Sequence, residues 1–286
     1  MTQKRKENKK EKQSKRRKDK GKIGHLDKTT QSVLKRMISD DDNSSGNVKQ
    51  KELLIDLETQ SKQRQDRFWS ALKERYQYDT SIKRGQDYLL NYVSSKIPLI
   101  IMYADLVGST KMSMTLPVDK LVTIIRAFSH ELSSVIENYD GYVLKYVGDA
   151  VIAFFAPGSN IYLTYDKAIR SAKSMIGVMT NGINPVLNKY DYPDLYMKIG
   201  IDSGENVVVQ YAYDKSSQID LLGYTMNIAA KITSLTSPNK VPIGENVYKF
   251  LHPGVQTEFH ELAYRTDEWK YINRDTGNLY KVYTLS

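Results

Sequence analysis

An aspartate at the end of an apolar run is the first residue in this sequence that suggests chemistry. Residues 99–104 are Leu, Ile, Ile, Met, Tyr and Ala, which predicts a buried strand, and Asp105 follows them directly. Gly108, Ser109 and Thr110 come next, and their backbone N–H groups could face an anion at the start of a helix. A strand, an acid and a phosphate-sized turn indicate a site for metal and phosphate. An aspartate at such a place can also simply cap a helix or form a turn.

A second acid, Asp149, lies in the tight turn 147–149 between two apolar segments, residues 142–146 and 150–155. These segments predict a hairpin, and a hairpin that neighbours the first strand would bring Asp149 close to Asp105. Two carboxylates without a His or Cys partner suit Mg²⁺ or Mn²⁺, whose remaining ligands are usually substrate phosphates. Two such ions can activate an attacking oxygen and neutralise a leaving polyphosphate. The acids therefore outline a nucleoside triphosphate site.

The elements that must position these acids follow from the hydrophobic periodicity. A short helix is predicted over 86–95, before the first strand, and the strongest helical pattern begins at Pro117 and runs to Ile136. After the first hairpin the sequence predicts a helix over 165–187, a hairpin of strands 197–202 and 206–211 turning at Ser203 and Gly204, helices over 225–236 and 245–251, and a strand over 280–285. The order βαββαβ with an added strand predicts an α+β fold, a ferredoxin-like sheet with helices on one face.

The N-terminal part has a different composition from the rest of the chain. Residues 1–48 are rich in Lys, Asp, Ser and Asn, which predicts a disordered tail. Residues 1–22 contain twelve basic and three acidic side chains, which accounts for the whole formal net charge of +9. Such a tail could contact nucleic acid or an acidic partner by charge alone, or be a solvated extension. Residues 49–97 predict a helical N-terminal extension, with apolar side chains roughly on one face over 48–78, and residues 98–286 form the main domain.

The amino-acid composition limits the kinds of functional site that the protein can have and its expected cellular location. The sequence has no cysteine, which excludes disulfides, thiolate zinc sites and cysteine nucleophiles and fits a reducing compartment. The longest apolar run, residues 97–107, is far too short for a membrane span, and the charged N-terminus shows no signal-peptide pattern. We therefore expect a soluble, cytoplasmic protein.

Four motifs in this chain together resemble the class III nucleotidyl cyclase catalytic domain. They lie at residues 104–110 (ADLVGST), 145–150 (KYVGDA), 200–205 (GIDSGE) and 223–231 (GYTMNIAAK), and the resemblance spans residues 99–283. Each motif alone is weak, but the four stand in the order typical of the family. The resemblance implies the class III cyclase fold for residues 98–286, a nucleoside triphosphate substrate and two Mg²⁺ or Mn²⁺ ions per site.

The resemblance also assigns roles to the acids and the loop. Asp105 and Asp149 match the two metal-binding aspartates, with the backbone carbonyl of Leu106 as a further ligand. The phosphates would be held by backbone amides of residues 106–110, which include Val107, Gly108, Ser109 and Thr110. A homodimer with composite active sites is implied, in which the partner protomer completes each site.

The residues that would read the base and orient the sugar come from the same resemblance. Lys145 matches the position that reads adenine, and Asp220 matches its companion. Lys would donate to ring N1 and Asp would accept from the exocyclic amine, a combination that guanine cannot satisfy. Asn227 matches the residue that orients the ribose.

Lys231 departs from the family pattern. The family usually has Arg four residues after the Asn, where its guanidinium stabilises charge on the reacting phosphate. Lys keeps the charge but loses the planar bidentate fork, so activity could be lower or the substrate could bind differently. A further phosphate-binding Lys is expected near the C-terminal hairpin, where Lys270 is a candidate.

The sequence favours an adenylate cyclase that converts ATP to cyclic AMP and pyrophosphate, and leaves two alternatives open. A pyrimidine nucleotide cyclase, making cyclic CMP or cyclic UMP, is the first, because a branch of the family departs from the usual pocket. Lys145 and Asp220 favour adenine, whereas Lys231 is compatible with a pyrimidine nucleotide cyclase. A non-catalytic nucleotide-binding domain is the second, and the presence of both Asp105 and Asp149 disfavours it.

Overall fold

The computed structural model describes residues 80–212, 217–263 and 269–285. The predicted tail over 1–48 and the predicted helix over 48–78 lie outside the described residues. The helices are α4 (Thr80–Leu90), α5 (Ser109–Thr115), α6 (Val118–Asn138), α7 (Ile161–Val178), α8 (Asn184–Asn188), α9 (Tyr224–Ile232), α10 (Glu245–Tyr248) and α11 (Pro253–Gln256). The strands are β1 (Lys96–Val107), β2 (Tyr142–Val147), β3 (Ala150–Phe155), β4 (Tyr196–Gln210), β5 (Ile219–Leu222), β6 (Pro242–Gly244), β7 (Phe259–Glu261) and β8 (Val282–Leu285).

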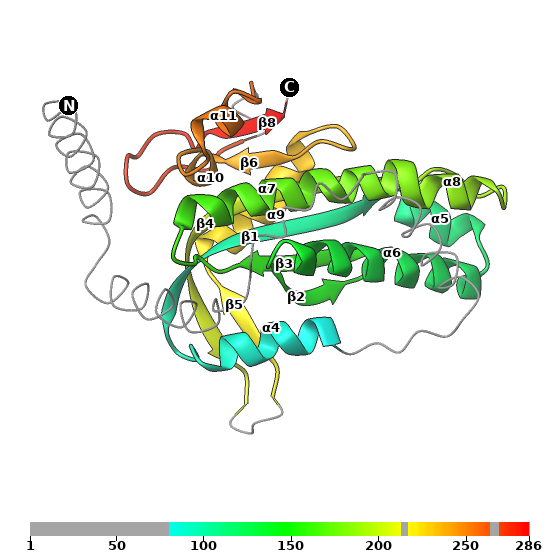
Figure 1. The fold of residues 1–286 in the computed structure, drawn as a ribbon, viewed down its shortest axis with the longest axis horizontal. Helices are drawn as coiled ribbons and strands as arrows, with labels where there is room; N and C mark the ends of the chain where they lie inside the picture. Colours follow the sequence, from blue (N-terminus) through cyan, green and yellow to red (C-terminus); the bar gives the residue numbers. More distant parts are fainter. Residues whose placement is uncertain (1–79, 213–216, 264–268, 286) are drawn as a thin grey trace, which may run out of the picture.

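One mixed sheet organises the described part of the chain (Figure 1). Its strands follow the order β2-β3-β1-β4-β6-β8-β7, and β5 pairs with β4 beside this path. Strand β1 lies between β3 and β4 and is antiparallel to both, in register from Lys96 opposite Val207 to Val107 opposite Tyr196 on the β4 side. Because β1 is central and buried for most of its length, Asp105 near its C-terminal end is held rigidly.

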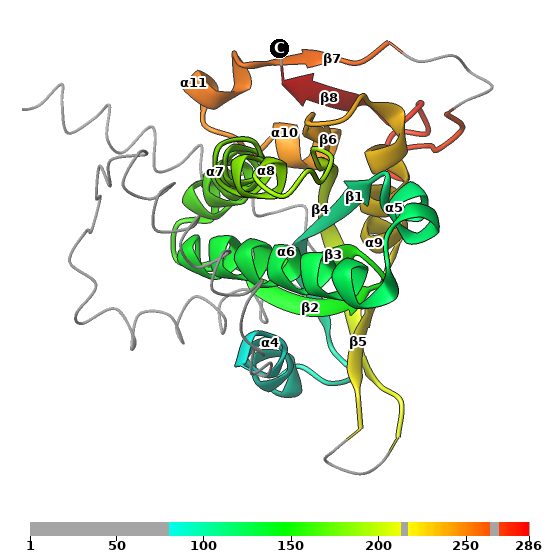
Figure 2. The same cartoon turned by 90° about the vertical axis from the view of Figure 1, so that its right-hand side faces the viewer.

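Helices pack on both faces of this sheet. Even-numbered residues of β1, among them Ile100 and Met102, point into a core shared with α6 and α7. Odd-numbered residues, among them Leu99 and Ile101, join a second core to which α4 and α9 contribute. Figure 2 shows α7 and α9 on opposite sides of β4. The sequence predicts helices on one face only; this detail is wrong, because α4 and α9 cover the opposite face.

The predicted fold class is confirmed, since the chain folds as a mixed α+β domain with the predicted βαββαβ order at its centre. The predicted hairpin with Asp149 in its turn is present as β2 and β3. The helix predicted from Pro117 is α6, with Pro117 as the residue before its first turn, and a separate helix, α5, begins at Ser109. The helix predicted over 165–187 starts earlier and passes through a π-helical turn, Met179–Ile183, into α8. The short helix predicted over 86–95 is α4, shifted toward the N-terminus.

The predicted hairpin with a turn at Ser203 and Gly204 is wrong. Both residues lie inside β4, which continues without a turn and pairs with β1 across this point. A glycine inside a strand often marks the close approach of another element, and here the Thr225 side chain of α9 occupies the space that a Cβ on Gly204 would need. The hairpin partner of β4 is instead β5, which pairs with residues 207–210.

None of the described helices combines the length and the apolar character that a membrane span requires.

Candidate active site

Asp105 and Asp149 lie at adjacent strand ends. Ala104 of β1 pairs with Val151 of β3, and Asp149 is in the two-residue turn that precedes β3. Burial and the neighbouring carboxylate of Asp149 raise the pKa of Asp105 above its usual value. The Asp149 Oδ2 atom is buried and has no hydrogen-bond partner among the described residues. Two repelling carboxylates, one with an unsatisfied buried oxygen, are what a bound cation would stabilise.

Glycines shape the backbone on either side of these acids. Gly148 has φ of 62° in the turn between β2 and β3, a conformation that suits a two-residue hairpin loop and is costly for other residues. Gly108 has φ of 89° and precedes α5. The amides of Ser109 and Thr110 are in the first turn of α5, where no intrahelical acceptor exists for them. The chain from Asp105 to Thr110 therefore leaves backbone donors next to a carboxylate.

A β-bulge directs Lys145 onto the same face of the sheet as Asp105. The pairing of β2 with β3 shifts between Val143 and Lys145, so Leu144 is an extra residue in β2. Val143 points into the core under α6, whereas Leu144 points into the opposite core. Without the bulge, strict alternation would turn Lys145 into the apolar core under α6. With it, Lys145 stands opposite Ile152, whose side chain also faces the second core.

Lys145 and Asp220 meet although they are far apart in the sequence. The Lys145 Nζ donates to Asp220 Oδ2 in a charge-assisted hydrogen bond. Asp220 Oδ1 accepts from the backbone N–H of Leu221 at 2.9 Å, which fixes the orientation of the carboxylate. The two side chains are 27% and 9% exposed. The pair is shielded enough to be strong, yet it leaves N–H groups of Lys145 and oxygen lone pairs of Asp220 for a ligand.

Asn227 and Lys231 lie one turn apart on the exposed side of α9. The opposite side of α9 is buried through residues such as Ile228 and Ala229. Both side chains are exposed, so a single copy of the chain displays them toward solvent. Lys270 is exposed as well and follows Trp269, whose indole N–H donates to the carbonyl of Tyr280 at 2.7 Å.

The comparison with known families decides what this arrangement is. A family model described as the adenylate and guanylate cyclase catalytic domain matches residues 92–272. The chain belongs to this family. The match covers all four motifs and the strands and helix that carry them.

Named relatives of this cyclase domain act on different bases. A cytidylate cyclase from Staphylococcus aureus is 27% identical over 157 residues, which are 52% of this chain and 36% of the relative. A uridylate cyclase from Burkholderia cepacia is 28% identical over 167 residues, which are 57% of this chain and 71% of the relative. The aligned part thus spans about a third of the length of the cytidylate cyclases that it matches.

Solved structures share the fold of the cyclase domain. The guanylyl cyclase Cya2 matches with a TM-score of 0.57 and 20% identity, over 68% of this chain and 93% of its own. The adenylyl cyclase CyaB from P. aeruginosa matches with a TM-score of 0.54 and 18% identity, over 67% of this chain and 95% of its own. These identities are low, so the likeness is one of fold.

Tyr103 is a further residue near Lys145 and Asp220 that the four motifs do not predict. It stands two residues before Asp105 on the same face of β1, and it pairs with Ile152, the residue opposite Lys145. Burial, and then the charge of Asp220, raise the pKa of the Tyr103 hydroxyl. Its ring therefore lies beside the pair formed by Lys145 and Asp220. The period of two from Asp105 could have pointed to it.

Proposed function

We propose that this chain is a nucleotide cyclase that forms a 3′,5′-cyclic nucleotide and pyrophosphate at sites shared by two copies of the chain. The 3′-hydroxyl oxygen bonds to the α-phosphorus and gives up its proton, while the bond to the pyrophosphate oxygen breaks. The contact between Lys145 and Asp220, on the same face of the sheet as Asp105, carries the proposal. It supplies a base-reading pair within one copy.

The acids fit a magnesium or manganese site. Hard carboxylate oxygens suit these ions, and the unpartnered Oδ2 of Asp149 together with the raised pKa of Asp105 is consistent with a cation between them. No group of three His, Cys, Asp or Glu side chains suited to a metal occurs among the described residues, so substrate oxygens and the carbonyl of Leu106 would complete the coordination. Bound there, two ions would lower the charge on the triphosphate.

The chain's own residues would position the substrate. Backbone amides of Val107 to Thr110 would hold phosphate oxygens, and Asn227 would orient the ribose. Lys231 would neutralise charge that develops on the reacting phosphate, as a point charge in place of a guanidinium fork. Asn227 and Lys231 are exposed, and so are the apolar side chains of Val147 and Leu222. A second copy of the chain is the partner that we propose would cover them.

The chemistry of the pair selects a base with an exocyclic amine beside an unprotonated ring nitrogen. Lys145 has only donors and Asp220, when ionised, only acceptor oxygens. Cytosine presents an amine beside N3 and adenine presents one beside N1, so both fit. Guanine and uracil present a carbonyl beside a protonated ring nitrogen and fit poorly.

We therefore propose CTP as the substrate, forming cyclic CMP, with ATP as the second candidate. The sequence predicts that the pair favours adenine, but cytosine offers the same two atoms. The similarity to relatives named cytidylate cyclase favours CTP over ATP.

Incubation with ATP, CTP, GTP and UTP in the presence of Mn²⁺ tests this proposal. Mass spectrometry of the products is expected to show cyclic CMP as the main product, with cyclic AMP next and little cyclic GMP or cyclic UMP. Cyclic AMP as the main product would favour the second candidate. Absence of a cyclic product from all four nucleotides would refute the enzymatic function.

The Lys231→Ala variant is expected to lower kcat about tenfold or more while KM changes little, because the charge would act on the transition state more than on the bound substrate. Steady-state kinetics with the preferred nucleotide measures both constants. Lys189→Ala removes an exposed lysine next to α8 and serves as the control, with unchanged kinetics. A selective rise in KM would instead place Lys231 in ground-state binding.

A further inference from the structure

Helix α4 connects the two strands that carry Lys145 and Asp220. Its Gln86 side chain forms two hydrogen bonds with one residue of β5: Nε2 donates to the carbonyl of Ile219 at 3.0 Å, and the N–H of Ile219 donates to Oε1 at 2.9 Å. Within the described sheet, β5 pairs only with β4. The Gln86 amide therefore occupies the other edge of β5, where a neighbouring strand would otherwise bind.

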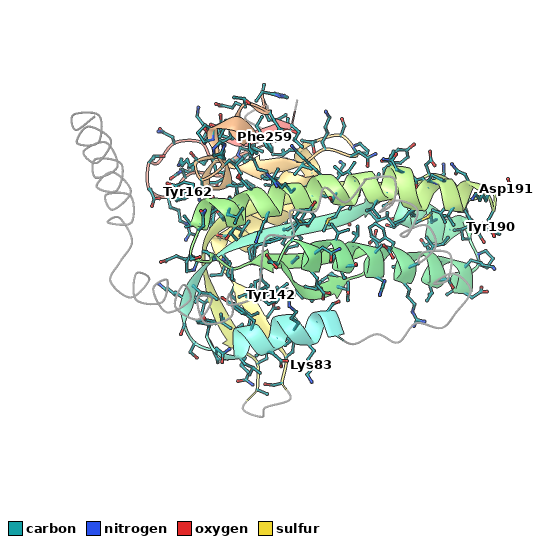
Figure 3. All side chains as sticks on the ribbon, viewed as in Figure 1. Lys83, Tyr142, Tyr162, Tyr190, Asp191 and Phe259 are labelled. Atoms are coloured by element: carbon teal, nitrogen blue, oxygen red, sulfur yellow. The ribbon has the colours of Figure 1, made fainter. Side chains whose placement is uncertain are left out.

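The same helix lies directly against β2. A Cβ on Gly85 would collide with the carbonyl oxygen of Val143, the residue just before the bulge that directs Lys145. Arg84 donates to the carbonyl of Gly141 at 2.8 Å, and its guanidinium lies 4.3 Å from the centre of the Tyr142 ring. Tyr142, labelled in Figure 3, lies between α4 and the sheet. Helix α4 thus contacts both strands within one turn, at Ile219, the neighbour of Asp220, and at Val143, two residues before Lys145.

We propose that Gln86 is a positioning residue for recognition of the nucleobase. It fixes the backbone of Ile219, and Asp220 is the next residue. Lys145 is fixed independently through Gly85 and β2, so the separation of the two charged groups depends on α4. Two hydrogen bonds to a base require both groups to be placed within a few tenths of an ångström, and a shift of β5 would disturb one of them. This inference rests on the proposed role of Lys145 and Asp220.

Packing alone does not explain Gln86. Gln86 is half-buried, and an apolar side chain of the same length could cover the same surface. The amide is instead used to pair both polar groups of one backbone residue. These two hydrogen bonds fix the position of β5 relative to α4. Binding of the base requires this position to be fixed, whereas burial of α4 does not.

The Gln86→Met variant tests the inference, because Met keeps the length and bulk and removes both hydrogen bonds. Binding of the four 3′-deoxynucleoside triphosphates, which lack the attacking hydroxyl, is measured by calorimetry, and turnover of the four natural nucleotides is measured in parallel. We expect affinity for the preferred nucleotide to fall about tenfold and affinity for the others to change little, so that discrimination is reduced. In turnover, KM is expected to rise more than kcat falls.

The control is Lys83→Ala on the same helix. Lys83 is exposed and lies on the side of α4 away from β2 (Figure 3). It should leave base discrimination unchanged. Thermal unfolding of both variants is recorded so that the effect on recognition can be compared with the effect on stability.

The outcomes separate this inference from the proposed function. If Gln86→Met unfolds at a lower temperature but keeps the wild-type preference among nucleotides in binding, the positioning role is refuted and Gln86 only stabilises the fold. If the wild-type protein forms no cyclic product, the proposed reaction fails, and the calorimetry still decides whether Gln86 sets selectivity. Equal binding of all four nucleotides by the wild type would refute the inference as well.

Discussion

The Asp149→Asn protein is expected to form cyclic nucleotide about a thousandfold more slowly than the wild type. Asn has the same shape as Asp but lacks the charge that would hold a cation, and the Oδ2 of Asp149 is the buried oxygen without a described partner. Removing the charge also removes the repulsion that contributes to the raised pKa of Asp105. Initial rates with the preferred nucleotide and Mn²⁺ measure the loss.

Stability distinguishes this loss from misfolding. The variant is expected to keep or increase the free energy of unfolding in metal-free buffer, because a like-charge contact is relieved. It should also lose the rise in melting temperature that Mn²⁺ gives the wild type. Asp140→Asn is the matched control, since Asp140 is an exposed acid at the other end of β2 that pairs with Lys167. An Asp149→Asn protein that turns over normally would contradict the metal assignment.

A mixture of Asp149→Asn and Lys145→Ala proteins is expected to recover activity although each is inactive alone. In a mixed dimer with shared sites, one site carries both defects and the other carries neither. Random pairing places one intact site in half of the dimers, which restores about a quarter of the wild-type rate. The two variants are mixed and diluted so that they exchange subunits, and the activity of the mixture is then assayed. Rates that stay at the level of the separate variants would argue for sites contained in one copy.

Much of the fold was predictable because its signals are local. The apolar run before Asp105, the helical spacing from Pro117 and the turn at Gly148 each specify one element, and the order of elements then limits the sheet to a few arrangements. The acids at the ends of β1 and of the first hairpin come together for the same reason: neighbouring strands place their ends side by side.

The errors have a common physical origin. Gly204 and the turn glycines look alike in the sequence, but Gly204 is required by contact with Thr225 from a helix that comes later in the chain. Nothing in the sequence of residues 142–147 marks the bulge at Leu144, although it determines which face Lys145 occupies. The bond between Gln86 and Ile219 joins residues 133 positions apart. Such features depend on tertiary contacts that no short window of sequence contains.

Asp202 is a buried acid in the motif at residues 200–205, and the resemblance assigns it no role. It is 1% exposed, and its Oδ1 accepts from the Tyr280 hydroxyl at 2.6 Å. Gly244 leaves room for its carboxylate, and Glu245 and Lys249 are the charged groups nearby. Burial raises the pKa of Asp202 to about 7, against the lowering effect of the bonds from Tyr280 and Ser203.

The Asp202→Asn protein is therefore expected to unfold less easily than the wild type at pH 8 and to match it only near or below the ordinary carboxyl pKa, at about pH 4. Between the ordinary carboxyl pKa and pH 7, native Asp202 holds a proton that the unfolded chain releases, so its stabilising contribution is complete at low pH and declines as pH rises toward 7. The upper bound is about 4 kcal/mol for a shift of this size. Asn stays neutral and its carbonyl can still accept from Tyr280, so it escapes this decline.

Urea unfolding of both proteins at several pH values from about 4 to 8 measures the difference. The control is Asp191→Asn, an exposed position labelled in Figure 3, which should parallel the wild type at every pH. If Asp202→Asn keeps the wild-type slope, the carboxylate is already charged in the folded protein. In that case the short bond from Tyr280 would be one to an anion, and the coupling between β4 and the C-terminal segment would be strongest above pH 7 instead of below it.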